Sequence, residues 1–253
     1  MLLTIDVGNT TTGVAIFDGD DIVFRNKLAT PDEVSNKFLR SLIKRSLLNE
    51  GDGIIVSSVV PLLDESLETG IQELFGQKPL FINHRTKTGL EIKIDRPDEL
   101  GADLIAGAVG GLYFYPPPFV VIDSGTATTF GAVNRDHEYI GGAILPGVEI
   151  SIKSLAANAA KLNRIHFNVP DSIVGKNTED CIRSGIFYCN LGGINYMIQE
   201  YKELLGSDTN IILTGGLIRH FKDRLQGIDL FEPDLIYYGL KKIHAQLHIR
   251  GEA

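Results

Sequence analysis

One strand-and-turn motif occurs twice in the 253-residue chain. In the first copy a hydrophobic run ends on Asp6-Val7-Gly8 and is followed by Thr11-Thr12. In the second copy a hydrophobic run ends on Asp123-Ser124-Gly125 and is followed by Thr128-Thr129, each residue lying 117 positions after its counterpart. A repeat on the scale of a domain predicts two similar lobes, at residues 1–115 and 116–253. The alternative, in which Asp6 and Gly8 only form a hairpin turn, does not require a second copy.

Strand and helix signals alternate along the chain, which predicts an α/β fold. The segment Thr30-Pro31-Asp32-Glu33 has the spacing of a helix-capping box and predicts a helix that starts there and runs to Leu47. A long helix is predicted from about Thr178 to Leu205, and the small residues of 100–115 predict a closely packed helix. Pro116-Pro117-Pro118 interrupts any helix and separates the two lobes.

Composition argues against several classes of protein. No apolar run approaches the roughly 18 residues of a membrane helix, and the N-terminus lacks a signal-peptide pattern, so we expect a cytoplasmic protein without a membrane partner. The formal net charge of -8 argues against a nucleic-acid partner. Cys181 and Cys189 lack the spacing of metal ligands, and we expect two reduced thiols buried in a helix.

The repeated motif suits the binding of phosphate, although the chain contains neither a P-loop sequence nor the three-glycine dinucleotide fingerprint. Glycine turns expose backbone N–H groups, threonine hydroxyls add donors, and a neighbouring carboxylate can hold Mg²⁺. A third strand ends on Thr214-Gly215-Gly216, where bare backbone lets a flat ligand approach. A tight turn is the alternative for these two glycines.

Several blocks of the sequence, in order along nearly the whole chain, resemble type III pantothenate kinases, members of the acetate and sugar kinase, heat-shock chaperone and actin superfamily. The blocks are DVGNT, GIIVSSVVP, KTGLEIK, GAD, DSGTATTF, YIGGAILPG, AAKL, VGKNT, SGIFY and TGGL. The resemblance implies two lobes of ribonuclease H-like (actin-like ATPase) topology with a nucleotide cleft between them. It also implies a homodimeric transferase that phosphorylates pantothenate with ATP, the first step of coenzyme A biosynthesis.

The resemblance implies roles for the residues of both motifs. Asp6 is expected to position Mg²⁺, and Asp123 stands where the family binds a monovalent cation, K⁺ or NH₄⁺. The residues expected to bind ATP or its phosphates are Asp6, Val7, Gly8, Asn9, Thr10, Thr11, Thr12, Gly13, Thr126, Gly215 and Gly216.

On the substrate side, the resemblance makes Asp103 the base that accepts the proton of the pantothenate hydroxyl. The alternative is a carboxylate that only stabilises a helix N-terminus. The family places arginine where this chain has Leu104 and usually tyrosine where it has Ile94. These differences keep two alternatives open, a nucleotide-binding regulatory paralogue without kinase activity and a kinase for another small hydroxyl compound. The expected substrate site comprises Ile94, Gly101, Ala102, Asp103, Leu104 and Thr178, the last of which has a helix cap as its alternative.

Two histidines, His244 and His248, stand four residues apart near the C-terminus. This spacing could bind a metal ion, but no glutamate-containing zinc motif surrounds the pair. A solvated helix face is the favoured interpretation.

Overall fold

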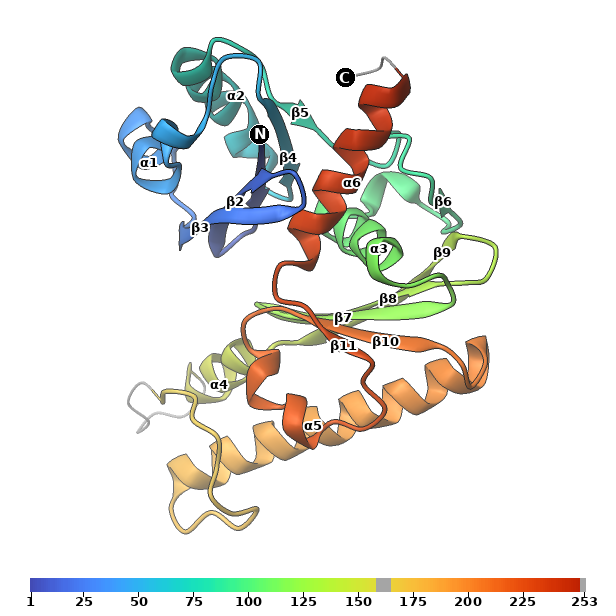
Figure 1. Cartoon of the computed structure of the whole chain (residues 1–253). Helices are drawn as coiled ribbons and strands as arrows, with labels where there is room; N and C mark the ends of the chain where they lie inside the picture. Colours follow the sequence, from blue (N-terminus) through green and yellow to red (C-terminus); the bar gives the residue numbers. More distant parts are fainter. Residues whose placement is uncertain (158–164, 251–253) are drawn as a thin grey trace. The chain divides into compact units, whose positions relative to one another are not determined.

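The computed structural model describes residues 1–157 and 165–250, which form two compact units. Unit 1 comprises Met1–Phe114 together with residues 234–250, and unit 2 comprises the described part of Tyr115–Pro233. Figure 1 labels their helices and strands. The C-terminal helix α6 (Leu235–Arg250) belongs to unit 1, whereas the sequence-based division had placed residues 116–253 in one lobe.

Glycines explain why α6 folds with unit 1. A Cβ atom at Gly239 of α6 would overlap the carbonyl group of Ala106, and one at Gly110 of α3 (Ala102–Phe114) would overlap the carbonyl oxygen of Leu235. The two helices therefore approach each other backbone to backbone, which any larger residue at these positions would prevent. The small residues of α3 thus serve packing within the chain.

Unit 1 is built on a mixed sheet with the strand order β3-β2-β1-β4-β5. Strands β1, β2 and β3 are antiparallel neighbours, and β4 runs parallel to both β1 and β5. Leu3, Ile5 and Val7 of β1 pack with residues of α1 and α2, whereas α6 contacts β1 and β4. Because side chains alternate along a strand, Asp6 faces away from α1 and α2. The bounds are β1 Leu2–Val7, β2 Thr11–Asp18, β3 Asp21–Ala29, α1 Asn36–Leu42, η1 Arg45–Leu47, β4 Gly53–Ser58, α2 Pro61–Phe75, β5 Leu80–Phe81, β6 Glu91–Ile92 and η2 Pro97–Glu99.

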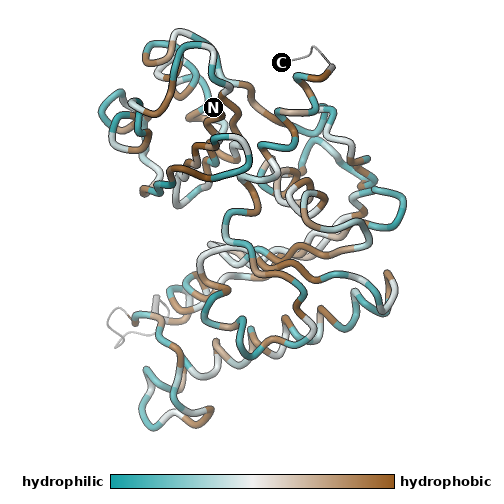
Figure 2. Tube along the Cα trace, in the orientation of Figure 1, coloured by the Kyte–Doolittle hydropathy of each residue, from teal (hydrophilic) through white to brown (hydrophobic). Residues whose placement is uncertain are grey.

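Unit 2 repeats this plan with the strand order β11-β10-β7-β8-β9. Strands β7, β8 and β9 are antiparallel neighbours, and β10 runs parallel to β7 and β11. Strand β7 therefore corresponds to β1, and the second copy of the motif lies at its end. Figure 2 shows hydrophobic residues along the central strands, and Val120 and Ile122 of β7 pack with residues of α4 and α5. The bounds are β7 Phe119–Ser124, β8 Ala127–Val133, β9 Glu138–Pro146, α4 Val148–Ala157, α5 Thr178–Leu205, β10 Asn210–Thr214, η3 Ile218–His220, η4 Lys222–Arg224 and β11 Leu230–Phe231.

Two sequence-based expectations were wrong. The first helix begins at Asn36 with Ser35 as its N-cap, because the Thr30 hydroxyl donates to the Gly8 carbonyl at 2.6 Å instead of capping a helix. Both cysteines lie on α5, as expected, but both are exposed. The AAKL block, 159–162, lies outside the described residues.

Candidate active site

The loop between β1 and β2 is fixed by hydrogen bonds within unit 1. The Gly8 N–H donates to the Thr11 carbonyl at 3.0 Å, and the backbone N–H of Thr30 donates to the Thr10 carbonyl at 3.0 Å. The Thr12 hydroxyl lies 3.0 Å from that of Thr30, and Thr12 is buried. Thr12 and Thr30 therefore support the loop from beneath, while Asn9 and Thr10 are exposed at its tip.

Asp6 lies between two neighbours in the sheet, Gly13 on β2 and Ser57 on β4. The Tyr237 hydroxyl of α6 occupies the space that a Cβ atom at Gly13 would fill. Burial raises the pKa of Tyr237, and the negative charge of Asp6 raises that pKa further. The Ser57 hydroxyl is buried, and none of the residues that the structure describes forms a hydrogen bond with it. Asp6 is thus held on a surface of small groups and hydroxyls.

Asp103 lies in the first turn of α3, at the same end of unit 1 as the β1–β2 loop. The Val59 N–H donates to the Val7 carbonyl at 3.0 Å, and the Val59 side chain lies 3.4 Å from where Gly101 would carry a Cβ atom. The Asp103 carboxylate crowds the same position of Gly101. Val7, Val59, Gly101 and Asp103 therefore form a continuous row of neighbours from the end of β1, where the β1–β2 loop begins, to the expected base.

Burial raises the pKa of Asp103 above its usual range, and the Leu104 N–H, which donates to Oδ1 at 2.7 Å, partly opposes that shift. A carboxylate with a raised pKa is a better proton acceptor than an exposed one. Leu104 therefore contributes through its backbone, and its side chain is half-buried. Ala102 is buried and Ile94 is half-buried.

Basic residues near Ile94 are candidates to replace the cation missing at Leu104. Lys93 forms a salt bridge with Glu91 at 2.5 Å, and Arg96 forms one with Glu99 at 2.8 Å. Both cationic side chains are about half exposed or more, so these ion pairs are weak and exchangeable.

Unit 2 gathers its expected residues at the end of β7. Asp123 pairs with Thr214 of β10, and Gly215 follows with a φ angle of 92°. A Cβ atom at Gly215 would lie 2.6 Å from the Ser124 carbonyl oxygen and 2.7 Å from the Ser124 nitrogen. A Cβ atom at Gly216 would meet nothing within 4 Å. Gly215 is thus required by the close approach of two backbone segments, whereas Gly216 presents bare backbone to open space.

The turn after β7 carries Thr126 and is also closely packed. A Cβ atom at Gly147, which follows β9, would overlap the backbone carbonyl groups of Gly125 and Thr126. Sequence reasoning did not single out Gly147. The Leu-Pro-Gly sequence at the end of β9 indicates a turn at this position.

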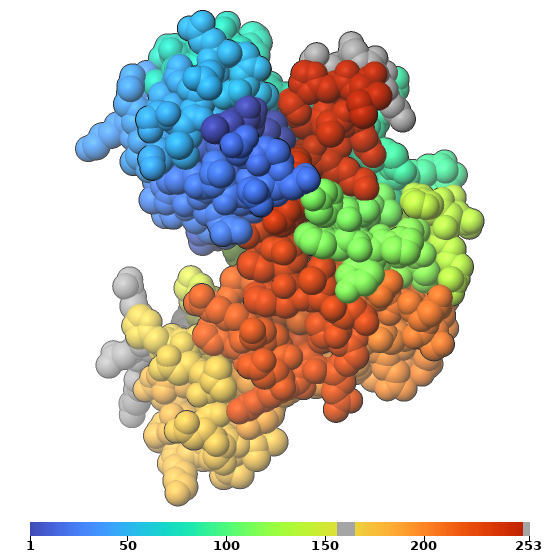
Figure 3. All heavy atoms as spheres, in the orientation of Figure 1, coloured from blue at the N-terminus to red at the C-terminus, as the bar shows by residue number. Residues whose placement is uncertain are grey.

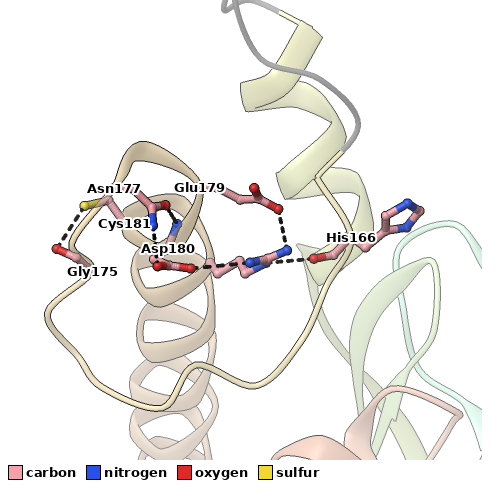
Figure 4. Close-up of polar contacts among 7 residues, drawn as sticks. His166, Gly175, Asn177, Glu179, Asp180 and Cys181 are labelled. Atoms are coloured by element: carbon pink, nitrogen blue, oxygen red, sulfur yellow. Dashed lines mark hydrogen bonds and ion pairs between the residues drawn. The ribbon is translucent and has the colours of Figure 1, made fainter.

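Thr178 is the first residue of α5, and its turn is held by a polar network shown in Figure 4. Asn177 caps the helix by accepting from the Asp180 N–H at 2.9 Å. Arg183 donates to the His166 carbonyl at 2.9 Å and forms ion pairs with Glu179 and Asp180. The guanidinium group therefore fixes both the incoming loop and the two residues after Thr178.

Comparison with known proteins decides the family. The model of the type III pantothenate kinases matches residues 2–200. The chain belongs to the type III pantothenate kinase family. The type III pantothenate kinases of Geobacillus sp. (strain WCH70) and Geobacillus kaustophilus (strain HTA426) are each 38% identical over 250 residues, covering 96% of this chain and 97% of the relative. The family activity is the ATP-dependent phosphorylation of pantothenate in coenzyme A biosynthesis, and the chain is accordingly a kinase that uses ATP.

Solved structures place the fold among the actin-like ATPases and sugar kinases. A chain titled as a conserved putative Baf family transcriptional activator from Campylobacter jejuni superposes with a TM-score of 0.62 at 22% identity, covering 98% of this chain and 99% of the other. MreB 5 of Spiroplasma citri superposes with a TM-score of 0.56 at 11% identity, covering 99% of this chain and 98% of the other. These similarities confirm the expected fold class. Among the described residues no helix has the length and apolar character needed to cross a membrane.

The donor set suits a nucleotide and a divalent cation. Mg²⁺ prefers oxygen ligands, and Asp6 supplies a carboxylate at the mouth of a loop whose tip residues are exposed. The turn at Gly8 is tight, because a Cβ atom there would lie 3.1 Å from the Thr11 carbonyl oxygen. These residues fit the groups that the family requires.

Proposed function

We propose that Asp103 is the catalytic base with which this chain phosphorylates pantothenate. The observation that carries the proposal is the row of neighbours Val7, Val59 and Gly101, which places the Asp103 carboxylate close to the β1–β2 loop. Burial raises the pKa of this carboxyl group. The hydroxyl oxygen of pantothenate bonds to the γ-phosphorus of ATP while the bond from that phosphorus to ADP breaks. Asp103 accepts the hydroxyl proton, so the products are the phosphate ester and ADP.

The loop from Asp6 to Gly13 would hold the phosphates of ATP, with Asp6 as the carboxylate that holds Mg²⁺. The ion would neutralise the charge of the transferred group. In unit 2, Thr126 and the open backbone at Gly216 would contact the nucleotide. The hydrogen bonds of Thr30 to the loop keep its donors in place, which favours transfer because phosphoryl transfer depends on alignment.

The direct test of the function measures ADP release on addition of pantothenate with ATP, Mg²⁺ and K⁺. The proposal predicts turnover that depends on pantothenate. Binding of ATP without such turnover would favour a regulatory paralogue. Turnover with another hydroxyl compound alone would assign a different substrate.

Asp123 is proposed to hold a monovalent cation, K⁺ or NH₄⁺. Its carboxylate and the Ser124 carbonyl oxygen both lie beside Gly215, at the end of β7. Oxygen ligands of this kind suit a weakly hydrated cation. Replacing K⁺ by Na⁺ should reduce the rate strongly, and equal rates in the two salts would remove the argument for an ion at Asp123.

The reaction is proposed to take place in the cytoplasm, where ATP is available.

A homodimer is proposed to form through one face of α5. Five small or apolar residues, spaced three or four apart, are exposed along that face: Cys181, Gly185, Cys189, Gly192 and Tyr196. A Cβ atom at Gly185 or Gly192 would meet nothing within 4 Å, so a large residue there leaves the isolated subunit intact. Gly192→Arg should convert a dimer to a monomer. Its Tm should fall only by the stabilisation that dimer formation gives, because the subunit itself stays folded. A wild-type mass equal to one chain at all concentrations would contradict the proposal.

A further inference from the structure

Helix α6 carries two histidines that lie outside the expected phosphate and substrate residues. His244 and His248 lie one helical turn apart, and their Nε2 atoms are 3.1 Å from each other. The two rings meet edge to face with their centroids 4.3 Å apart. The two imidazole nitrogens therefore lie at hydrogen-bond distance from each other beside the helix.

His244 is held in place by the fold of unit 1. Its ring fills the position that a Cβ atom at Gly53, the first residue of β4, would occupy. Burial lowers the pKa of His244 to about 4, and the charge of His248 lowers it in the same direction. The His244 ring is therefore held against the start of β4 and is partly withdrawn from solvent.

His248 is exposed, so an ion from solvent can reach the pair. Figure 3 shows the last turns of α6 at the surface of the molecule. The ring of His244 is packed against Gly53, so this ligand has little side-chain freedom to lose on binding.

The separation of the two nitrogens matches the bite of a chelated metal. With Zn–N bonds of about 2.05 Å, two nitrogens 3.1 Å apart subtend an angle of about 98° at the ion. This angle lies between the octahedral and the tetrahedral values. Imidazole ligands suit Zn²⁺, Ni²⁺ and Cu²⁺, whereas Mg²⁺ prefers oxygen.

We propose that His244 and His248 form a bidentate site for a divalent transition metal on α6, separate from the Mg²⁺ that the kinase reaction uses. No group of three or more His, Cys, Asp or Glu residues that could hold a metal occurs among residues 1–157 and 165–250. Water would complete the coordination shell, so the ion would be exchangeable. A bound ion would link two turns of α6 beside Gly53 and stabilise unit 1.

The test is calorimetric titration of the untagged protein with Zn²⁺, in the absence of nucleotide. The Cys181→Ser/Cys189→Ser background removes the two exposed thiols, because cysteine thiolates are zinc ligands in general and would compete for the ion. The proposal predicts one bound Zn²⁺ and a Tm that rises with its concentration. In that background His248→Ala should weaken binding by at least roughly tenfold, because loss of a direct ligand costs no less than loss of an outer-shell partner.

The control is His137→Asn, which removes an exposed histidine from unit 2 at a position with a φ of 62° that asparagine tolerates. This variant should bind Zn²⁺ as the parent does. Equal Zn²⁺ affinity in the parent and in His248→Ala would overturn the proposal and leave only a hydrogen bond between the rings. The outcome does not depend on kinase activity.

Discussion

Gly215 and Gly216 offer a matched pair of substitutions that separates folding from nucleotide contact. In Gly215→Ala the new Cβ atom would lie 2.6 and 2.7 Å from backbone atoms of Ser124, and the φ of 92° is unfavourable for alanine. The backbone conformation costs about 1 to 2 kcal/mol, and the forced displacement of packed backbone costs about 1 to 3 kcal/mol more. We therefore expect the free energy of unfolding to fall by about 2 to 5 kcal/mol.

The loss should appear as a fall in Tm of roughly 4 to 20 °C in thermal denaturation monitored by circular dichroism. Gly216→Ala is the control, because its Cβ atom meets nothing within 4 Å and its φ is not positive. Its Tm should stay within a few degrees of the wild type. If the backbone at Gly216 contacts the nucleotide, the same variant should raise the KM for ATP and leave that for pantothenate unchanged. An unchanged Tm in Gly215→Ala would refute the packing argument.

Three further predictions concern the substrate side. Leu104→Arg should lower the KM for pantothenate by about one to two orders of magnitude, because the arginine would form a charge-assisted hydrogen bond with the pantothenate carboxylate. A raised KM in steady-state assays would show that the site is rebuilt around leucine. Because burial raises the pKa of Asp103, the wild type loses stability as pH rises through that pKa. Denaturant unfolding should therefore show Asp103→Asn to be more stable than the wild type at neutral pH, with the difference vanishing in acid, and a less stable variant at neutral pH would contradict the shift. Arg183→Ala should raise the KM for pantothenate more than it lowers kcat, and Arg183→Lys should restore part of the loss. An unchanged KM would show that the polar network around Arg183 does not position Thr178.

The sequence predicted the features that depend on local pattern or on the repeat. The helix from Thr178 to Leu205 has the predicted bounds, because its ends carry an asparagine cap and a glycine. The two copies of the motif lie at corresponding strand ends of the two sheets. Each copy follows a strand that pairs with its neighbours in the same way in both sheets, so the repeat in the sequence predicted the repeat in the fold.

Long-range contacts account for what the sequence could not predict. Thr30 had the spacing of a helix cap, but its hydroxyl and N–H are bound to the loop at Gly8 and Thr10 instead. The assignment of α6 to unit 1 depends on the fit between Gly239 and the backbone of Ala106. Tyr237 is brought beside Asp6 by that same packing, and nothing in its local sequence indicated a place near the site.

Asp103 is proposed to accept the hydroxyl proton of pantothenate. The most direct measurement compares ADP release by the wild type and by Asp103→Asn at saturating ATP, Mg²⁺ and K⁺, with ATP affinity measured separately by calorimetry. Asp103→Asn should bind ATP with nearly wild-type affinity and lose the turnover that depends on pantothenate. Turnover in Asp103→Asn close to that of the wild type would contradict this role.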